Sequence, residues 1–461
     1  MRGGFFMLKF TKITASIGPK SSNHAILTKM VRAGVNLVRI NFSHDTGDVQ
    51  GAKIDTIRTV SRELKTPVGI IVDLQGPKHR IGDFASDEKY KLTVGQRFVF
   101  DSNETPGDNT RVCLPHPDVI ASLHAGDRIL LNDGKLEMRV DKCEPTKIIA
   151  TVIRGNEIWS RRGFNLPDTF IDTEILTQKD KADLEYAITK NPDFVAVSFV
   201  QSADDIAYVR DFITARTAHK INIIAKIERP HAVHDIDNIV AVADGIMIAR
   251  GDLAVEMPFE QVPAISRHII RVCRQMNKPV IMATQMLASL VDSEFPTRAE
   301  ISDVANAAYL RTDSCMTSEE TTVGINPVHT IQTMSRILSY ADMDTIANPN
   351  DWLRIDNIPE NNWSRSVASM AHLNNASAII VFDRDGVATT EISCRRPDMP
   401  IVAVCNDETV ANHLCLSRGV FPICDPEIFG RRDAKSAAKT IGIRIGAVVI
   451  VDDGTISLCE L

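Results

Sequence analysis

The chain has 461 residues, of which 44% are hydrophobic, and its 52 Lys and Arg residues are outnumbered by 59 Asp and Glu residues. This length exceeds what one hydrophobic core normally serves, so two or three domains are expected. The net charge of −7 excludes a general basic field of the kind that holds nucleic acid or an anionic membrane. The nine cysteines lack CxxC or zinc-type spacing and no apolar run is long enough to cross a bilayer, so a soluble, cytoplasmic protein with reduced thiols is expected.

Three short apolar runs near the N-terminus each end in polar residues, and they are predicted to be strands. They cover residues 12–19, 36–44 and 69–78. The second places Arg39, Asn41 and Ser43 on one face, because successive side chains of a strand point to opposite faces. The third delivers Asp73 close to its end.

Residues 77–173 have a different character, with short alternating strands and turns and little helical periodicity. This pattern predicts a small β-barrel domain inserted into a loop of the main domain. An insertion that grows out of a catalytic face is placed like a lid.

Five further strands follow, at residues 194–200, 223–228, 245–252, 279–285 and 313–321. Eight strands, most followed by an amphipathic segment, predict an α/β fold with a TIM barrel formed by residues 1–76 and 174–346, whose catalytic groups gather at the C-terminal strand ends. The pattern alone leaves an open doubly wound sheet as an alternative, although no dinucleotide fingerprint follows the first strand. Residues 347–461 alternate strands and helices again and predict a C-terminal α/β domain.

The polar strand ends suggest phosphate chemistry with a divalent metal. Glu228 and Asp252 end consecutive strands, and two hard carboxylates suit Mg²⁺ or Mn²⁺ with open positions for substrate and water. Lys226 lies two residues before Glu228 and faces the same way, which also fits an ordinary ion pair at the end of a strand. Arg39 and Arg80 add positive charge, and cations that converge with a metal indicate a phosphorylated acid as substrate.

The segments that carry these residues resemble the pyruvate kinase family over nearly the whole chain. They are TKITASIGP, RINFSH, DLQGPKHR, RGFNLP, KIERPHAV, DGIMIARGDLAVEMP, KPVIMATQM and PTRAEISDVANA, in the order and spacing of the family. The resemblance implies a TIM barrel, an inserted β-barrel domain and a C-terminal α/β domain, which agrees with the partition above. It also implies phosphoryl transfer from phosphoenolpyruvate to ADP, giving pyruvate and ATP, and a homotetramer.

The resemblance assigns roles to the residues that bind the phosphorylated acid. Glu228 and Asp252 match the ligands of the divalent metal, and Lys226 matches the group that stabilises the phosphoryl in flight and the forming enolate. Arg39 matches the phosphate-binding arginine. Thr284 matches the hydroxyl close to the carbon that is protonated, directly or through water. Gly251, together with Asp252, matches the amides that hold the substrate carboxylate.

The remaining roles concern the nucleotide and a monovalent cation. Positions on the nucleotide side are matched by His44, Arg80 and Arg162, the last where a lysine is common. The monovalent-cation pocket is matched by Asn41, Ser43, Asp73 and the carbonyl of Leu74. Lys78 stands where potassium-dependent members usually carry Glu, so we predict that its ammonium replaces the charge of K⁺ and that K⁺ is not required.

The sequence departs from the family pattern in two places. Around the eighth strand, residues Leu310, Arg311, Thr317 and Glu319 differ from the usual ones and add charge and bulk. The loop at residues 382–388, FDRDGVA, carries Asp383 and Asp385 where members activated by fructose 1,6-bisphosphate hold a phosphate, which predicts no such activation. Two other functions stay open at this point: a divalent-metal lyase acting on 2-oxo acids, and a non-catalytic assembly protein on the same scaffold.

Overall fold

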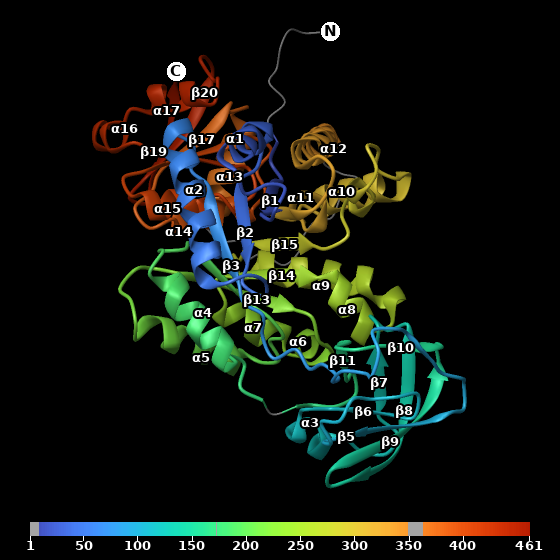
Figure 1. Ribbon diagram of the computed structural model, residues 1–461. Helices are drawn as coiled ribbons and strands as arrows, with labels where there is room; N and C mark the ends of the chain where they lie inside the picture. Colours follow the sequence, from blue (N-terminus) through green and yellow to red (C-terminus); the bar gives the residue numbers. More distant parts are fainter. Residues whose placement is uncertain (1–8, 172, 349–362) are drawn as a thin grey trace.

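A closed barrel of eight parallel strands forms the centre of the molecule (Figure 1). The computed structural model describes residues 9–171, 173–348 and 363–461. In ring order the strands are β1 (Lys12–Ser16), β2 (Leu37–Asn41), β3 (Gly69–Asp73), β12 (Phe194–Val197), β13 (Asn222–Ile227), β14 (Gly245–Ala249), β15 (Val280–Ala283) and β16 (Ser314–Thr317). All eight predicted strands are therefore confirmed, and the closed ring replaces the open sheet that the pattern left as an alternative. Arg39, Asp73 and Lys226 lie in the last residues of their strands, whereas Glu228 and Asp252 follow theirs.

Helices surround the barrel because the outward-facing strand residues are apolar and pack against amphipathic helices. These helices are α1 (His24–Ala33), α2 (Gly47–Leu64), α4 (Gln178–Ile188), α5 (Ala203–Thr214), α6 (Pro230–His234), α7 (Ile236–Val242), α8 (Arg250–Glu256), α9 (Val262–Gln275), α10 (Arg298–Tyr309), α11 (Glu319–Thr322) and α12 (Pro327–Ala347). Capping boxes at Thr177 and Thr297 fix where α4 and α10 begin. None of the helices in the described part of the chain is long and apolar enough to cross a membrane.

The interior of the barrel is filled by the alternate strand residues, which form a separate buried cluster. Leu37, Phe194 and Met247 belong to it, and Cys415 and Leu416 of the C-terminal part close it from below. The barrel is thus a packed core rather than a pore. The C-terminal rim lies beyond this packed core and can carry polar side chains that face a cavity.

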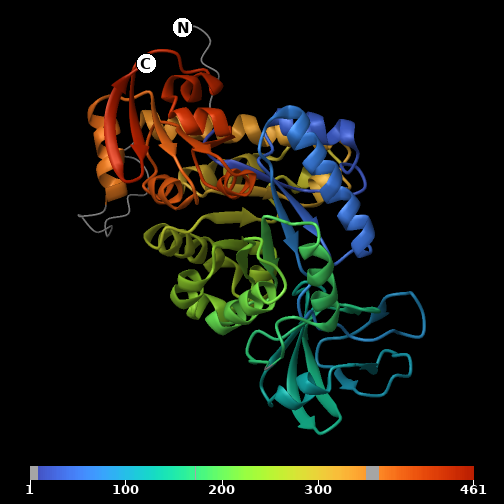
Figure 2. The ribbon, with the colours of Figure 1, turned by 90° about the vertical axis from the view of Figure 1, so that its left-hand side faces the viewer.

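The segment between β3 and α4 folds around a hydrophobic core of its own. Its strands β4 (Tyr90–Lys91), β5 (Arg97–Asp101), β6 (Arg111–Cys113), β7 (Arg128–Leu131), β8 (Leu136–Glu144), β9 (Lys147–Arg154), β10 (Glu157–Ile158) and β11 (Phe164–Asn165) accompany the short helix α3 (Pro117–Ser122). Six of them form one sheet in the order β11-β7-β8-β9-β5-β6, and β10 pairs with β4. Figures 1 and 2 show this unit projecting from one end of the barrel, the end where the catalytic strand ends were predicted.

The C-terminal part is a five-stranded sheet in the order β19-β18-β17-β20-β21 with helices on its faces. It contains α13 (Trp363–Leu373), β17 (Ala378–Phe382), α14 (Val387–Cys394), β18 (Ile401–Cys405), α15 (Glu408–Leu414), β19 (Val420–Cys424), α16 (Pro426–Arg431), α17 (Ala434–Thr440), β20 (Ala447–Asp452) and β21 (Thr455–Glu460). The sheet is parallel except for β21. It packs against the barrel at the end opposite the inserted unit (Figure 1).

Candidate active site

A cavity of about 430 Å³ lies at the C-terminal ends of the barrel strands. It brings together most of the predicted site residues, since its lining includes Arg39, Asn41, Ser43, His44, Lys78, Arg80, Lys226, Glu228 and Asp252. Gln75, Ser198 and Phe199 complete the wall. Residues from the ends of five strands, β2, β3, β12, β13 and β14, and from the loops that follow them therefore converge as the barrel topology predicts.

Lys226 and Glu228 face the same way at the end of β13. The Lys226 ammonium lies 3.1 Å from Glu228 Oε1 and 3.2 Å from Asp73 Oδ1, and all three side chains are buried. Burial alone would lower the pKa of Lys226, but the carboxylates of Asp73 and Glu228 outweigh it and raise that pKa. Lys226 is therefore a fixed positive charge that faces the cavity.

Arg39 adds a second cation on the other side of Asp73. Its Nε and Nη2 atoms both lie 2.5 Å from Asp73 Oδ2, and its Nη1 donates to Ser16 Oγ over 3.1 Å. Burial opposes the charge of Asp73, yet Arg39 and Lys226 together hold the pKa of this carboxyl below its usual value. Asp73 thus aligns two cations along one wall, which is an arrangement that suits a phosphate.

Ser198 links Lys226 to the backbone, a role that the sequence did not reveal. The ammonium of Lys226 donates to Ser198 Oγ over 2.6 Å, and that hydroxyl lies 2.7 Å from the carbonyl oxygen of Leu74 and 3.5 Å from Asp73 Oδ1. An ammonium can only donate, so the single hydroxyl hydrogen is left for the nearer oxygen, that of Leu74. Ser198 follows β12 directly, and the strand-end pattern that selected Asp73 was the available signal.

Glu228 and Asp252 are the two carboxylates suited to a divalent metal. Glu228 Oε2 accepts the N–H of Phe199 over 2.7 Å, and Phe199 itself has a left-handed φ of 60°. Burial and the charge of Asp252 raise the pKa of Glu228, so the buried Glu228 carboxylate is repelled by the partly exposed Asp252 carboxylate. A divalent cation would relieve that repulsion, and no group of three or more His, Cys, Asp or Glu that could hold a metal occurs in the described part of the chain. The residues therefore fit a hard cation that keeps positions free for substrate and water.

Thr284 and Gly251 bond to each other at the neighbouring strand ends. The Gly251 N–H donates to Thr284 Oγ1 over 2.8 Å, so this amide already has a partner. Thr284 has a φ of 70°, which is rare for a β-branched residue and marks a conformation held by its surroundings. Arg250 stabilises this conformation of Thr284, because its Nη2 donates to the Thr284 carbonyl over 2.8 Å. Both Nη atoms of Arg250 also lie 2.7 Å from the Asp303 carboxylate.

Comparisons with known proteins identify the family of this chain. The model of the pyruvate kinase barrel domain matches residues 8–331, and that of the pyruvate kinase alpha/beta domain matches residues 361–456. The chain belongs to the pyruvate kinase family. A pyruvate kinase of Methylorubrum extorquens is 39% identical over 96% of this chain and 94% of the relative, and one of Thermococcus litoralis is 36% identical over 98% and 94%. The crystal structure of a pyruvate kinase from Cryptosporidium parvum covers 98% of this chain and 96% of its own, with 29% identity and a TM-score of 0.91.

Membership of the pyruvate kinase family makes the chain a phosphotransferase and gives no support to a lyase or a non-catalytic scaffold. The ion pair that the strand pattern allowed for Lys226 and Glu228 is present in the structure. It belongs to a wider network around the cavity rather than to an isolated pair on the surface.

The residues matched to the nucleotide side of the family are only partly brought together. His44 and Arg80 line the cavity, and Arg80 Nη1 donates to the carbonyl of Arg161 over 3.1 Å. Arg162 is not part of the lining: its guanidinium packs 4.9 Å from the centre of the Trp159 ring, and its Nε donates to the Ser160 carbonyl over 3.3 Å. Its link to the nucleotide remains a prediction.

Lys78 points into the cavity and not to bulk solvent. Its ammonium lies 3.8 Å from Asp252 Oδ1, with 32% of the side chain exposed. The nearest carboxylate is thus a predicted metal ligand, whereas Asp73, which we expected beside it, is taken by Arg39 and Lys226. Leu74 and Asp73 do not line the cavity, while Asn41 and Ser43 do.

The family departures near β16 leave the strand end ordered. Thr317 is buried and its hydroxyl bonds to that of Thr321 over 3.0 Å, which accommodates the polar residue inside. Glu319 is exposed at the start of α11, so its charge stays in solvent. Leu310 and Arg311 lie at the opposite end of the strand, where Leu310 packs in the barrel core and Arg311 donates to the Arg396 carbonyl of the C-terminal part.

Proposed function

We propose that this cavity transfers the phosphoryl group of phosphoenolpyruvate to ADP, with Lys226 at its centre. The observation that supports this most is the buried ammonium of Lys226 held between Asp73 and Glu228 and facing the same cavity as Arg39. A charge fixed in a dry site before substrate arrives needs no reorganisation during the reaction, and phosphoryl transfer depends mainly on such positioning.

Arg39 would hold the substrate phosphate, and Lys226 would stabilise the phosphoryl group in flight and then the enolate oxygen. The amides of Gly251 and Asp252 would receive the substrate carboxylate at the start of α8. The Gly251 amide must first leave the Thr284 hydroxyl, which frees that hydroxyl near the carbon that is protonated. One local rearrangement would therefore prepare both the carboxylate site and the proton-transfer site.

Glu228 and Asp252 would hold Mg²⁺ or Mn²⁺. When bound, the metal would neutralise charge on the phosphoryl oxygens and help to align them with the nucleotide. Until then Lys78 supplies part of the positive charge near Asp252. His44 and Arg80 would contact the nucleotide, and movement of the inserted domain, residues 77–173, would bring Arg162 toward the cavity like the closing of a lid.

Catalysis would not require K⁺. Two of the four residues of the predicted monovalent-cation pocket already have donors for their oxygen atoms: Asp73 has Arg39 and Lys226, and the Leu74 carbonyl has Ser198. The nearby ammonium of Lys78 adds fixed positive charge to the same cavity. A protein that provides these charges itself has less need of a bound monovalent ion.

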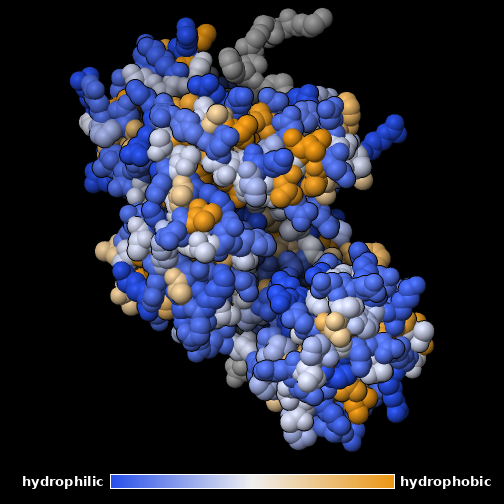
Figure 3. Space-filling view, viewed as in Figure 1, coloured by the Kyte–Doolittle hydropathy of each residue, from blue (hydrophilic) through white to orange (hydrophobic). Residues whose placement is uncertain are grey.

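The chain would act as a cytoplasmic homotetramer with the barrel at residues 1–76 and 174–346 and the C-terminal domain at 347–461. Support for association comes from exposed apolar side chains on and before α12, which include Tyr340, Met343, Val323 and Ile325. Figure 3 shows apolar side chains gathered on the part of the surface where α12 lies. Such patches often mark contacts between protein chains. Sedimentation equilibrium would test the oligomeric state.

The proposed reaction is tested by incubating the purified chain with phosphoenolpyruvate and Mg²⁺, with and without ADP. We expect pyruvate and ATP to form in equal amounts and only when ADP is present. Pyruvate released without ADP would indicate a lyase or phosphatase instead. Absence of any product in the presence of Mg²⁺, Mn²⁺ and added KCl would favour a non-catalytic scaffold.

A further inference from the structure

Four arginines meet where the barrel joins the C-terminal domain, far from the catalytic rim. Arg274 lies in the last turn of α9, Arg311 in the turn between α10 and β16, and Arg395 and Arg396 directly follow α14. Two of them belong to the barrel and two to the C-terminal domain. Arg311 Nη1 donates to the Arg396 carbonyl over 3.3 Å, and Arg396 Nε donates to the Arg311 carbonyl over 3.0 Å. Arg395 donates to Asn277, three residues after Arg274, and the charges of Arg396 and Arg311 add to burial in lowering the pKa of Arg274.

The carboxylates around these arginines do not balance their charge. Asp313 accepts from Arg396 over 2.6 Å, and its two oxygens also accept the backbone N–H groups of Arg418 and Val280. Asp398 lies 3.8 Å from Arg311 and also faces His372 at 4.0 Å. Neither carboxylate forms an ion pair with Arg274 or Arg395 in the described part of the chain.

Several guanidinium nitrogens in the cluster have no hydrogen-bond partner among the residues that the structure describes. Arg274 is 4% exposed, and both its Nε and its Nη1 are buried without an acceptor. Arg395 Nη1 and Arg311 Nε are buried and unpartnered as well. Guanidinium groups stay charged in proteins, so they cannot avoid this cost by losing a proton. Buried charges of this kind are normally paired, which indicates that an anion is missing from the cluster.

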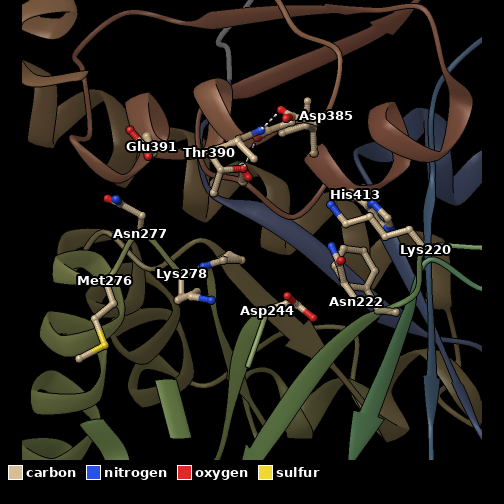
Figure 4. Close-up of a pocket in the computed structure, with 16 residues that line it drawn as sticks. Lys220, Asn222, Asp244, Met276, Asn277, Lys278, Asp385, Thr390, Glu391 and His413 are labelled. Atoms are coloured by element: carbon tan, nitrogen blue, oxygen red, sulfur yellow. Dashed lines mark hydrogen bonds between the residues drawn. The ribbon is translucent and has the colours of Figure 1, made fainter. Parts of the chain in front are cut away.

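A cavity of about 310 Å³ opens beside the cluster, between the base of the barrel and the C-terminal domain. Figure 4 shows Met276 and Asn277 on its barrel side and Thr390 and Glu391 on its C-terminal side. Asn277 Oδ1 accepts from Arg395, so this one side chain stands between the cavity and the guanidinium. A turn of Asn277 would open the cluster to the cavity. Glu391 makes no ion pair within the described residues. Its negative charge in the cavity wall would repel an anion from the cavity toward the arginines.

We propose that Arg274, Arg311 and Arg395 form a binding site for a phosphoryl group that bridges the barrel and the C-terminal domain. Guanidinium groups recognise phosphate oxygens through paired N–H donors, and three of them can satisfy a dianion from several sides. The ligand is inorganic phosphate or the phosphate of a small phosphomonoester. Because both domains supply donors, the anion stabilises their junction.

Thermal unfolding of the full chain in chloride buffer of constant ionic strength tests this site. Inorganic phosphate should raise the Tm in a saturable way, by roughly 2–4 °C at a hundredfold excess over its Kd. Glycerol 3-phosphate is the second probe, and a similar rise would assign the site to phosphomonoesters, whereas a rise with phosphate alone would assign it to the free ion. No saturable rise with either probe, or an equal rise with extra chloride, would overturn the proposal.

Four variants separate this site from other anion sites. Arg274→Met and Arg395→Met should lose most of the phosphate-dependent rise and weaken the Kd at least about tenfold, since each removes a donor. Lys226→Ala, altered in the catalytic cavity, and Arg128→Met, which loses an existing pair with Asp168, should keep it. Without phosphate, Arg274→Met should be at least as stable as the wild type, because an unpaired buried charge is removed. Retention of the full phosphate effect in both Arg274→Met and Arg395→Met would contradict the proposal.

Discussion

The position of Lys226 depends on three oxygen atoms from three strand ends. Asp73 and Glu228 balance its charge, and the Ser198 hydroxyl fixes its remaining direction while it is itself held by the Leu74 carbonyl. A charge that must meet a transferring phosphoryl group within a fraction of an ångström needs this kind of support. The carboxylates compensate the charge, whereas the serine mainly orients it.

Replacing Ser198 by Ala should therefore lower kcat by roughly 10- to 100-fold, with little change in the KM for phosphoenolpyruvate. Ser266→Ala is a matched control, because this buried hydroxyl in α9 also bonds to a backbone carbonyl but lies away from the cavity. Steady-state kinetics of both variants would check the prediction. Equal losses of kcat in the two variants would mean that Ser198 only supports the fold.

Replacing Lys78 should change whether catalysis depends on K⁺. We expect the wild type to show no large activation by KCl when the only other monovalent cation is a bulky quaternary ammonium at constant ionic strength. Lys78→Glu should create a K⁺ requirement, because it replaces a positive charge near the cavity carboxylates by a negative one. Strong KCl activation of the wild type would contradict the charge-replacement argument.

Strand ends were the elements that the sequence predicted best. Short apolar runs with polar ends identify the barrel, and a parallel barrel places all such ends on one rim, which is why Arg39, Lys226, Glu228 and Asp252 meet as expected. Loop conformation was harder to predict. The left-handed backbone of Thr284 and its bond to the Gly251 amide depend on Arg250, whose partner Asp303 is remote in sequence.

The loop between β17 and α14 supports the predicted insensitivity to fructose 1,6-bisphosphate. The buried Asp383 carboxylate accepts the N–H groups of Gly386 and Thr389 over 2.9 and 2.8 Å, so these amides are not free for a phosphate. Arg384, the nearby cation, lies 3.3 Å from Asp453. Phosphoenolpyruvate saturation curves with and without the sugar bisphosphate should therefore coincide. A clear shift of the curve to lower substrate concentration would refute this.

For the whole molecule, the least predictable feature was how the C-terminal domain meets the barrel. Leu416 and Cys415 close the barrel interior, and Lys12 on β1 donates to the Val420 carbonyl and lies 4.7 Å from the centre of the Phe421 ring. No periodicity in the sequence indicates such contacts, because the domains lie far apart along the chain. The same is true of Arg162, whose distance from the cavity depends on the placement of the inserted domain.

The domain junction should make stability depend on pH. Burial lowers the pKa of Lys12 to about 8 and that of Lys9 to about 7, from an ordinary 10.5. Between these values and 10.5 the unfolded chain binds more protons than the folded one, so these lysines raise stability as pH rises through that window. Below about pH 7 both are charged when folded, and the full cost of burying them is present.

Lys12→Met should accordingly increase the free energy of unfolding at pH 7 by an amount on the order of a few kcal/mol, which raises the apparent Tm. This gain should shrink toward pH 10. Calorimetry across this range is the measurement. Lys142→Met, at a position with 67% of the side chain exposed, should show no such trend. A lower Tm of Lys12→Met at pH 7 would mean that the charged lysine stabilises the junction.

On the proposed mechanism, Lys226 acts on the phosphoryl group and is more than a partner for two carboxylates. The kcat of Lys226→Ala for ADP-dependent pyruvate formation tests it most directly, with circular dichroism to verify the fold. We expect a decrease on the order of 10³-fold or more in a folded protein, because a charge aimed at the transition state is lost. A folded Lys226→Ala variant with near wild-type kcat would contradict it.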